Sequence, residues 1–175
     1  MNIGDYQALA RRTQNPDLTK DERRQHAIYG LVSEITEFMD AETRDERIKE
    51  LGDICWFSSE LCDVEGWAIE KIVDGAIPVF DNIMLVQCSV EEIDTGMILA
   101  AGSICSAYQK TYQGHELVHE YVEFAIRDIL AYAMASAKNL AVEDGINGIM
   151  AANIEKLRRR YPDGFSEEHS VNRVE

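Results

Sequence analysis

Apolar residues recur three and four positions apart along most of the chain, whereas strict alternation of apolar and polar residues is scarce. This spacing is typical of one buried face of an α-helix, so the pattern predicts an all-α protein. The predicted helices, with ends defined to within a few residues, cover residues 3–13, 20–42, 45–64, 67–86, 90–112, 115–140 and 146–161. Helices of this length in a chain of 175 residues indicate a helix bundle.

The length and the hydrophobic content of 46% are sufficient for one compact domain over residues 1–175. The strongest helix stop is Tyr161-Pro162-Asp163-Gly164, where proline and glycine follow a basic final turn. We expect residues 167–175, which come after this stop, to form a polar tail.

The two halves of the chain are faintly alike. Residues 47–57 are similar to residues 122–132, 75 positions later, with an aspartate, an isoleucine and an aromatic residue aligned. One interpretation is a duplication, with a metal-binding half at 1–88 and a degenerate repeat at 89–166 that carries a basic segment. The other is a chance likeness between two amphipathic helices.

The formal net charge of −15 disfavours binding to nucleic acids or anionic membranes, because the field of the molecule repels polyanions. A phosphate-bearing substrate needs cations placed locally, either as bound metal or as lysine and arginine. No apolar run approaches the length needed to cross a bilayer, and residues 1–13 lack the apolar segment of a signal peptide. We therefore expect a cytoplasmic protein, with reduced cysteines in its core at Cys55, Cys62, Cys88 and Cys105.

Two acidic pairs stand out in the second and third predicted helices. Glu34 and Glu37 form the first pair, and Glu50 and Asp53 follow after twelve residues. Each pair is spaced i, i+3, so its members project from neighbouring points on one helix face. The polar segment at 41–46 can turn the chain into an antiparallel hairpin with about 8–10 Å between helix axes. The two pairs could then face one another.

Four converging carboxylates repel one another unless a cation neutralises them. Oxygen ligands without histidine or thiolate favour Mg²⁺, with Mn²⁺ as a second choice. Di-iron bundles use Glu-x-x-His, whereas the fourth positions here are Glu37 and Asp53. A chain with 32 acidic residues also produces such pairs by chance on solvated helices. Their combination around a turn, with Trp56 and Phe57 outside the main apolar stripe, favours a metal site.

The ExxE-x12-ExxD spacing resembles the metal signature of the MazG-like nucleoside triphosphate pyrophosphohydrolases, relatives of the dimeric dUTPases. The segment 152–166, with its RRRYPDGFS sequence, is similar to the closing segment of many MazG-like domains. The two likenesses cover residues 6–57 and 146–166. The chain departs from the compact form of the family, because the closing segment begins about ninety residues after ExxD. A duplication or a helical insertion would account for the residues between.

The resemblance implies Mg²⁺-dependent attack of water between the α- and β-phosphates of a nucleoside triphosphate, which releases a nucleoside monophosphate and diphosphate. Glu34, Glu37, Glu50 and Asp53 would hold the metal, and Glu34 or Glu37 could accept the proton of the water. The resemblance also implies a homo-oligomer, with a dimer as the expected form. The base of the substrate stays open, and an alarmone is among the choices. The alternative is a catalytically silent nucleotide-binding or regulatory protein.

Four of the 17 basic residues, Lys156 and Arg158–Arg160, gather just before Tyr161. Cations at a helix C-terminus each contribute about 0.3–1 kcal/mol through the helix dipole, so the cluster alone fits a structural role equally well. The family resemblance favours phosphate binding by Lys156 and Arg159, with Asn153 on the same face. Arg158 and Arg160 are expected to be solvated. The active site would then be composite, with metal ligands from the first half and a phosphate clamp from the second.

Trp56 is a candidate for stacking on a nucleobase, a contact worth about 1–3 kcal/mol in single-stranded nucleic acid binding. Ordinary packing of a large aromatic ring is an equal alternative. The histidines have no spacing partners that indicate a metal site or a catalytic triad, and we expect surface positions for His26, His115, His119 and His169.

Overall fold

The computed structural model describes residues 3–172, which form eight α-helices and contain no strand. The bounds are α1 (Ile3–Arg11), α2 (Lys20–Asp40), α3 (Arg44–Glu65), α4 (Ile69–Val86), α5 (Val90–Thr111), α6 (His119–Asn139), α7 (Ile146–Arg160) and α8 (Glu167–Val171). The prediction of an all-α bundle is confirmed, and α1 to α7 match the predicted ranges within a few residues. The short α8 lies in the predicted polar tail, whose last three residues are outside the described range.

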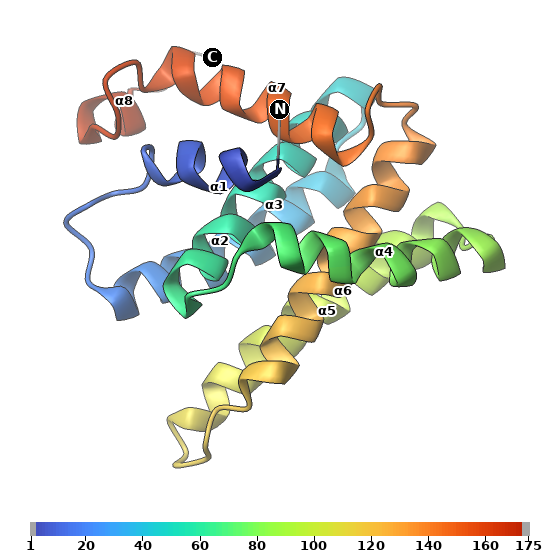
Figure 1. Cartoon of the computed structure of the whole chain (residues 1–175), viewed down its shortest axis with the longest axis horizontal. Helices are drawn as coiled ribbons and strands as arrows, with labels where there is room; N and C mark the ends of the chain where they lie inside the picture. The colour runs from blue at the N-terminus through green and yellow to red at the C-terminus, as the bar shows by residue number, and fades with distance from the viewer. Residues whose placement is uncertain (1–2, 173–175) are drawn as a thin grey trace.

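Helix α3 lies at the centre of the bundle (Figure 1). It packs along α2 and is also contacted by α1 and α7, which lie side by side at the top of the view. The pair of α5 and α6 extends to the bottom of the view, and α4 crosses α6. The functional residues predicted on α2, α3 and α7 therefore belong to one connected part of the molecule.

The helix starts follow from capping residues in the sequence. Thr19, Thr43 and Ser89 each accept a hydrogen bond from the backbone of the glutamate three residues later, and that glutamate reaches back to the cap. Such capping boxes satisfy backbone donors at the helix start, and loss of a cap costs about 0.5–2 kcal/mol. The short connection from Ala41 to Thr43 joins α2 and α3 as a helical hairpin.

The cysteines are free, as predicted, but only two of them are fully enclosed in the core. Cys55 and Cys62 are buried, whereas Cys88 and Cys105 are partly buried. Burial raises the pKa of the Cys55 thiol to about 12 and raises the pKa of Cys62 as well. Both core thiols therefore stay protonated and behave as small apolar side chains.

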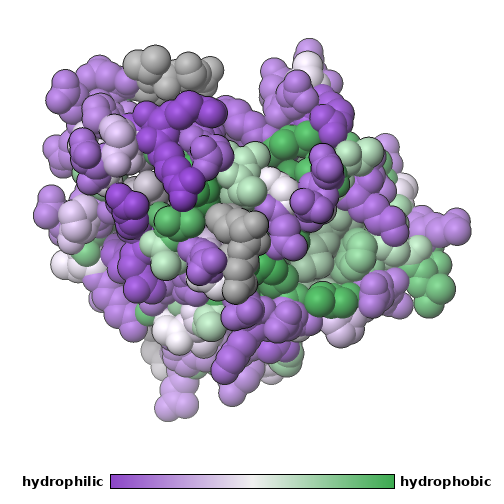
Figure 2. Space-filling model, turned by 45° about the horizontal axis from the view of Figure 1, so that its top comes forward, coloured by the Kyte–Doolittle hydropathy of each residue, from purple (hydrophilic) through white to green (hydrophobic). Residues whose placement is uncertain are grey.

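Apolar side chains also reach the surface. Figure 2 shows them gathered at the right of the view, the side on which α4 and the start of α5 lie in Figure 1. Ile77, Leu85 and Val86 of α4 are among the exposed large apolar residues. Within residues 3–172 no helix is both long and apolar enough to cross a membrane. Assembly into a homodimer stays a prediction.

Gly30 allows α2 and α3 to approach closely. A Cβ atom at Gly30 would lie 2.1 Å from Cε1 of Phe57. Gly30→Ala is expected to lower the free energy of unfolding by about 1–3 kcal/mol, because overpacking outweighs a gain of about 1 kcal/mol in helix propensity. Gly102→Ala in α5 is the matched control, since no atom lies within 4 Å of its added Cβ, and it should raise stability. Urea unfolding measures both, and a stabilised Gly30→Ala would contradict this packing.

Candidate metal centre and adjoining cleft

Three of the four predicted carboxylates meet between α2 and α3. Glu34 of α2 and Glu50 and Asp53 of α3 each place an oxygen within 4.8 Å of the other two. Glu50 is buried and the other two are partly buried. Lys49 Nζ lies 3.2 Å from Glu50 Oε1. These hard oxygen donors, drawn together without an imidazole or a thiolate among them, fit a divalent cation such as Mg²⁺ or Mn²⁺.

Glu37 lies outside this triad. Its side chain is exposed, and its Oε1 accepts a hydrogen bond from the Ser33 hydroxyl at 3.1 Å. Its charge still acts on the triad, because it is one of the causes that raise the pKa of Glu34. The roles of Glu37 as metal ligand and as proton acceptor stay predictions.

Negative charge at the triad acts most strongly on Glu34, whereas Glu50 and Asp53 each pair with a lysine. The pKa of Glu34 is raised to about 8, first by burial and then by the negative charges of Asp53, Glu37 and Glu50. A carboxyl group that stays protonated near neutral pH cannot offer its full charge to a metal. A bound divalent cation would relieve the repulsion and favour the ionised form.

This shift predicts how the stability of the metal-free protein depends on pH. The folded protein keeps a proton on Glu34 between the ordinary pKa of 4.5 and about 8, whereas the unfolded chain releases it. The free energy of unfolding should therefore fall as the pH rises from about 4.5 to about 8. Thermal unfolding in EDTA across this range measures the slope, and Glu34→Gln should flatten it. Equal slopes for parent and variant would contradict the raised pKa.

Helix α7 brings partners to Asp53 from a hundred residues away. Lys156 Nζ lies 2.5 and 2.6 Å from the two Asp53 carboxylate oxygens. Asn153 Nδ2 donates to Asp53 Oδ1 at 3.1 Å, and Asn153 Oδ1 accepts from the buried Tyr6 hydroxyl at 3.0 Å. The orientation of Asp53 is thus fixed by α7, and Lys156 supplies positive charge at the triad. Residues of the two predicted halves meet here.

Arg158 is exposed as predicted, Arg160 lies in the wall of the cleft beside the triad, and phosphate binding by Arg159 stays a prediction. Arg159 is exposed and does not line the cleft beside the triad, and Arg158 is exposed and pairs with Glu155 at 2.6 Å. Arg160, expected to be solvated, lines that cleft, and its Nε is buried without a hydrogen-bond partner among the described residues. The spacing from Asn153 and Lys156 to Arg160 keeps all three on one face of α7.

The cleft beside the triad has a volume of about 360 Å³, within the range of small-molecule sites. Glu34 and Asp53 lie in its wall, so the carboxylate cluster opens into it. Aromatic rings from two parts of the chain also line it, namely Trp56, Phe57, Tyr161 and Phe165. The wall of the cleft therefore contains both carboxylates and aromatic rings.

Trp56 is held in a defined orientation in this cleft. Its indole N–H donates to Thr13 Oγ1 at 2.9 Å, and the Thr13 hydroxyl donates to the Ala10 carbonyl at 2.8 Å. The ring packs edge-on against Phe57 with 4.8 Å between centroids. The indole is only partly buried, so part of it stays accessible. Base stacking by Trp56 stays a prediction.

The segment after α7 folds back over the cleft. The Phe165 N–H donates to the Arg12 carbonyl at 3.0 Å, which anchors this segment to the end of α1. Gly164 adopts φ 104°, and a Cβ there would lie 3.3 Å from the same carbonyl oxygen. The turn places Phe165 and Ser170 in the cleft wall. Ser170 belongs to the predicted polar tail of residues 167–175, whereas Phe165 precedes it.

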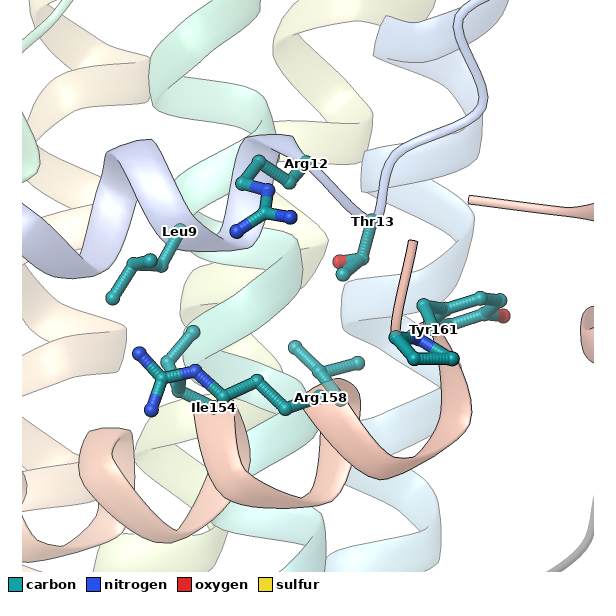
Figure 3. A pocket seen from close by; sticks show the side chains of 8 residues that line it. Leu9, Arg12, Thr13, Ile154, Arg158 and Tyr161 are labelled. Carbon is teal, nitrogen blue, oxygen red and sulfur yellow. The ribbon is translucent and has the colours of Figure 1, made fainter. Parts of the chain in front are cut away.

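A second, smaller pocket lies between α1 and α7. Figure 3 shows Leu9 and Arg12 on the α1 side and Ile154 and Arg158 on the α7 side. Its volume of about 30 Å³ matches the space of a single water molecule, so it cannot hold a nucleotide. Of these two pockets, only the cleft beside the triad has room for a small-molecule ligand.

Comparison of the chain with protein-family models, with curated proteins and with solved structures found no match. The structure shows an all-α protein with a carboxylate cluster that could hold a metal ion. The MazG-like resemblance rests on the acidic pairs and the closing segment alone.

Proposed function

We propose that this protein is a Mg²⁺-dependent nucleoside triphosphate pyrophosphohydrolase of the MazG-like kind. The observation that carries the proposal is that Glu34 and Asp53 belong both to the carboxylate triad and to the wall of the aromatic cleft. A nucleoside triphosphate offers groups for both, since its phosphates bind metal and its flat base can stack on aromatic rings. The cytoplasmic location and the dimer are further parts of the proposal.

The triad of Glu34, Glu50 and Asp53 would hold the metal. When bound, Mg²⁺ neutralises phosphate oxygens and makes a water molecule more nucleophilic. Lys156 lies beside the triad and Arg160 lines the cleft, so both can hold the negative charge of the phosphates through charge-assisted hydrogen bonds. This cationic contribution offsets the repulsion between the acidic molecule and its substrate.

Glu34 is the proton acceptor that the geometry favours over Glu37. It lies in the cleft wall, whereas Glu37 is exposed outside the triad. Water adds to one phosphorus of the α–β linkage, the bond from this phosphorus to the bridging oxygen breaks, and the proton of the water passes to the carboxylate. The products are a nucleoside monophosphate and diphosphate.

Incubation of the purified protein with a panel of canonical and modified nucleoside triphosphates and Mg²⁺ tests the proposal. Ion-exchange chromatography identifies the products. We expect monophosphate and diphosphate from at least one triphosphate, and loss of turnover in EDTA. Binding of nucleotides without any turnover would instead favour the silent binding protein. Release of orthophosphate as the primary product would point to attack at a different phosphate.

A further inference from the structure

His26 lines the same cleft, and a buried carboxylate holds its ring. Its Nδ1 lies 2.7 Å from Glu60 Oε2. The Glu60 side chain is 0% exposed, whereas the His26 side chain is 47% exposed. A carboxylate oxygen accepts hydrogen bonds, so this contact favours the imidazole tautomer that carries its proton on Nδ1.

Two aromatic rings pack against the imidazole. The His26 ring meets the Trp56 ring edge-on with 6.0 Å between centroids, and it lies 5.3 Å from the Phe57 ring. In the described part of the chain, His26 Nε2 has no hydrogen-bond partner. It is also not one of the buried side-chain atoms that lack a partner. With Nδ1 turned to Glu60, Nε2 is the ring atom left for a ligand in the cleft.

The pair is costly if its role is only structural. Burying a carboxylate takes it out of water, and a well-packed apolar residue of similar size is often at least as stabilising. Glu60 Oε1 has no hydrogen-bond partner among residues 3–172, and the nearest cation is Arg23, whose Nε is 3.9 Å away. A carboxylate that orients an imidazole at the wall of a binding cleft explains why such a group is buried here.

We propose that His26 selects the nucleobase of the substrate by accepting a hydrogen bond at Nε2. This inference rests on the proposed function, because it needs a base stacked near Trp56. The edge of such a base would lie beside the neighbouring His26 ring. A neutral imidazole with its proton on Nδ1 presents a lone pair at Nε2, which attracts an exocyclic amino group and repels a carbonyl oxygen. Cytosine and adenine are therefore favoured over uracil and hypoxanthine.

Binding of monophosphates to the metal-free protein tests the inference without hydrolysis. The probes are dCMP against dUMP and dAMP against dIMP, and calorimetry gives each dissociation constant. The amino member of each pair should bind about ten-fold more tightly than its oxo partner. His26→Asn keeps an amide N–H for Glu60 and removes Nε2, so the preference should fall below about two-fold. His115→Asn, exposed and outside the cleft, is the matched control and should keep the preference.

Glu60→Gln provides a second variant if His26→Asn does not fold. The glutamine amide can donate a hydrogen bond to His26 Nδ1, which permits the tautomer with the proton on Nε2. The preference for the amino member of each pair should then shrink. Equal binding of amino and oxo partners by the parent, absence of binding, or a preference unchanged in both variants would overturn the inference. Selective binding without triphosphate hydrolysis would overturn the proposed reaction alone. Hydrolysis without selective binding would overturn this inference alone.

Discussion

Glu50→Gln is expected to lower kcat/KM for triphosphate hydrolysis by about 10²- to 10³-fold while the protein stays folded. Glu50 is the buried member of the triad, and glutamine keeps its size but removes its charge. Loss of one ligand charge removes several kcal/mol of metal-dependent stabilisation of the transition state, and each 1.36 kcal/mol corresponds to about a factor of ten. The free energy of unfolding should be unchanged or higher, because repulsion with Glu34 and Asp53 is relieved.

Steady-state kinetics and circular dichroism of the same preparation measure both effects. Asp53→Asn should give a similar loss, although it also leaves Lys156 without its carboxylate partner. Asp40→Asn is the matched control, since it removes one exposed carboxylate from α2 outside the triad. Near-normal turnover by Glu50→Gln would remove the triad from the mechanism.

Arg160→Ala is expected to raise KM by about ten-fold, and Lys156→Ala combined with it by up to about a hundred-fold. Hydrogen bonds to charged groups contribute about 1.5–3 kcal/mol, and both side chains lie where the phosphates would bind. Mg²⁺ binding to the substrate-free protein should not weaken, because loss of Lys156 leaves Asp53 more available to the metal. Kinetics and Mg²⁺ titration by calorimetry separate the two effects.

Arg159→Ala is the matched control for this prediction. The exposed Arg159 should change KM by less than about two-fold, as expected for an isolated surface charge. A larger rise in KM from Arg159→Ala than from Arg160→Ala would support Lys156 and Arg159, the phosphate-binding pair predicted from the sequence. Kinetics of the Lys156/Arg160 double variant equal to those of the parent would exclude α7 from phosphate binding.

The helices and their hairpin were predictable because local rules decide them. Residues three and four apart produce the apolar faces, and Thr19 and Thr43 start α2 and α3 with capping boxes. The twelve residues between the acidic pairs allow one turn of chain, which is why Glu34 approaches Glu50 and Asp53. Short-range spacing was sufficient for these features.

Other features depend on contacts between distant segments, which no local pattern reveals. Arg159 and Arg160 are adjacent residues of the same type, and only the packing of α7 on α3 decides which one reaches the cleft. His26 and Glu60 are 34 residues apart, and a single sequence gives no indication that two residues at this separation are in contact. The turn at Gly164 depends on the Arg12 carbonyl at the far end of the chain.

Phosphorus NMR of a triphosphate reaction with Mg²⁺, run in parallel for the parent and Glu50→Gln, tests the central claim most directly. The best substrate from the triphosphate panel is used for both proteins. We expect the signals of nucleoside monophosphate and diphosphate to grow together with the parent and to stay at background with the variant. Nucleoside diphosphate with orthophosphate as first products, no turnover by the parent, or equal turnover by Glu50→Gln would contradict it.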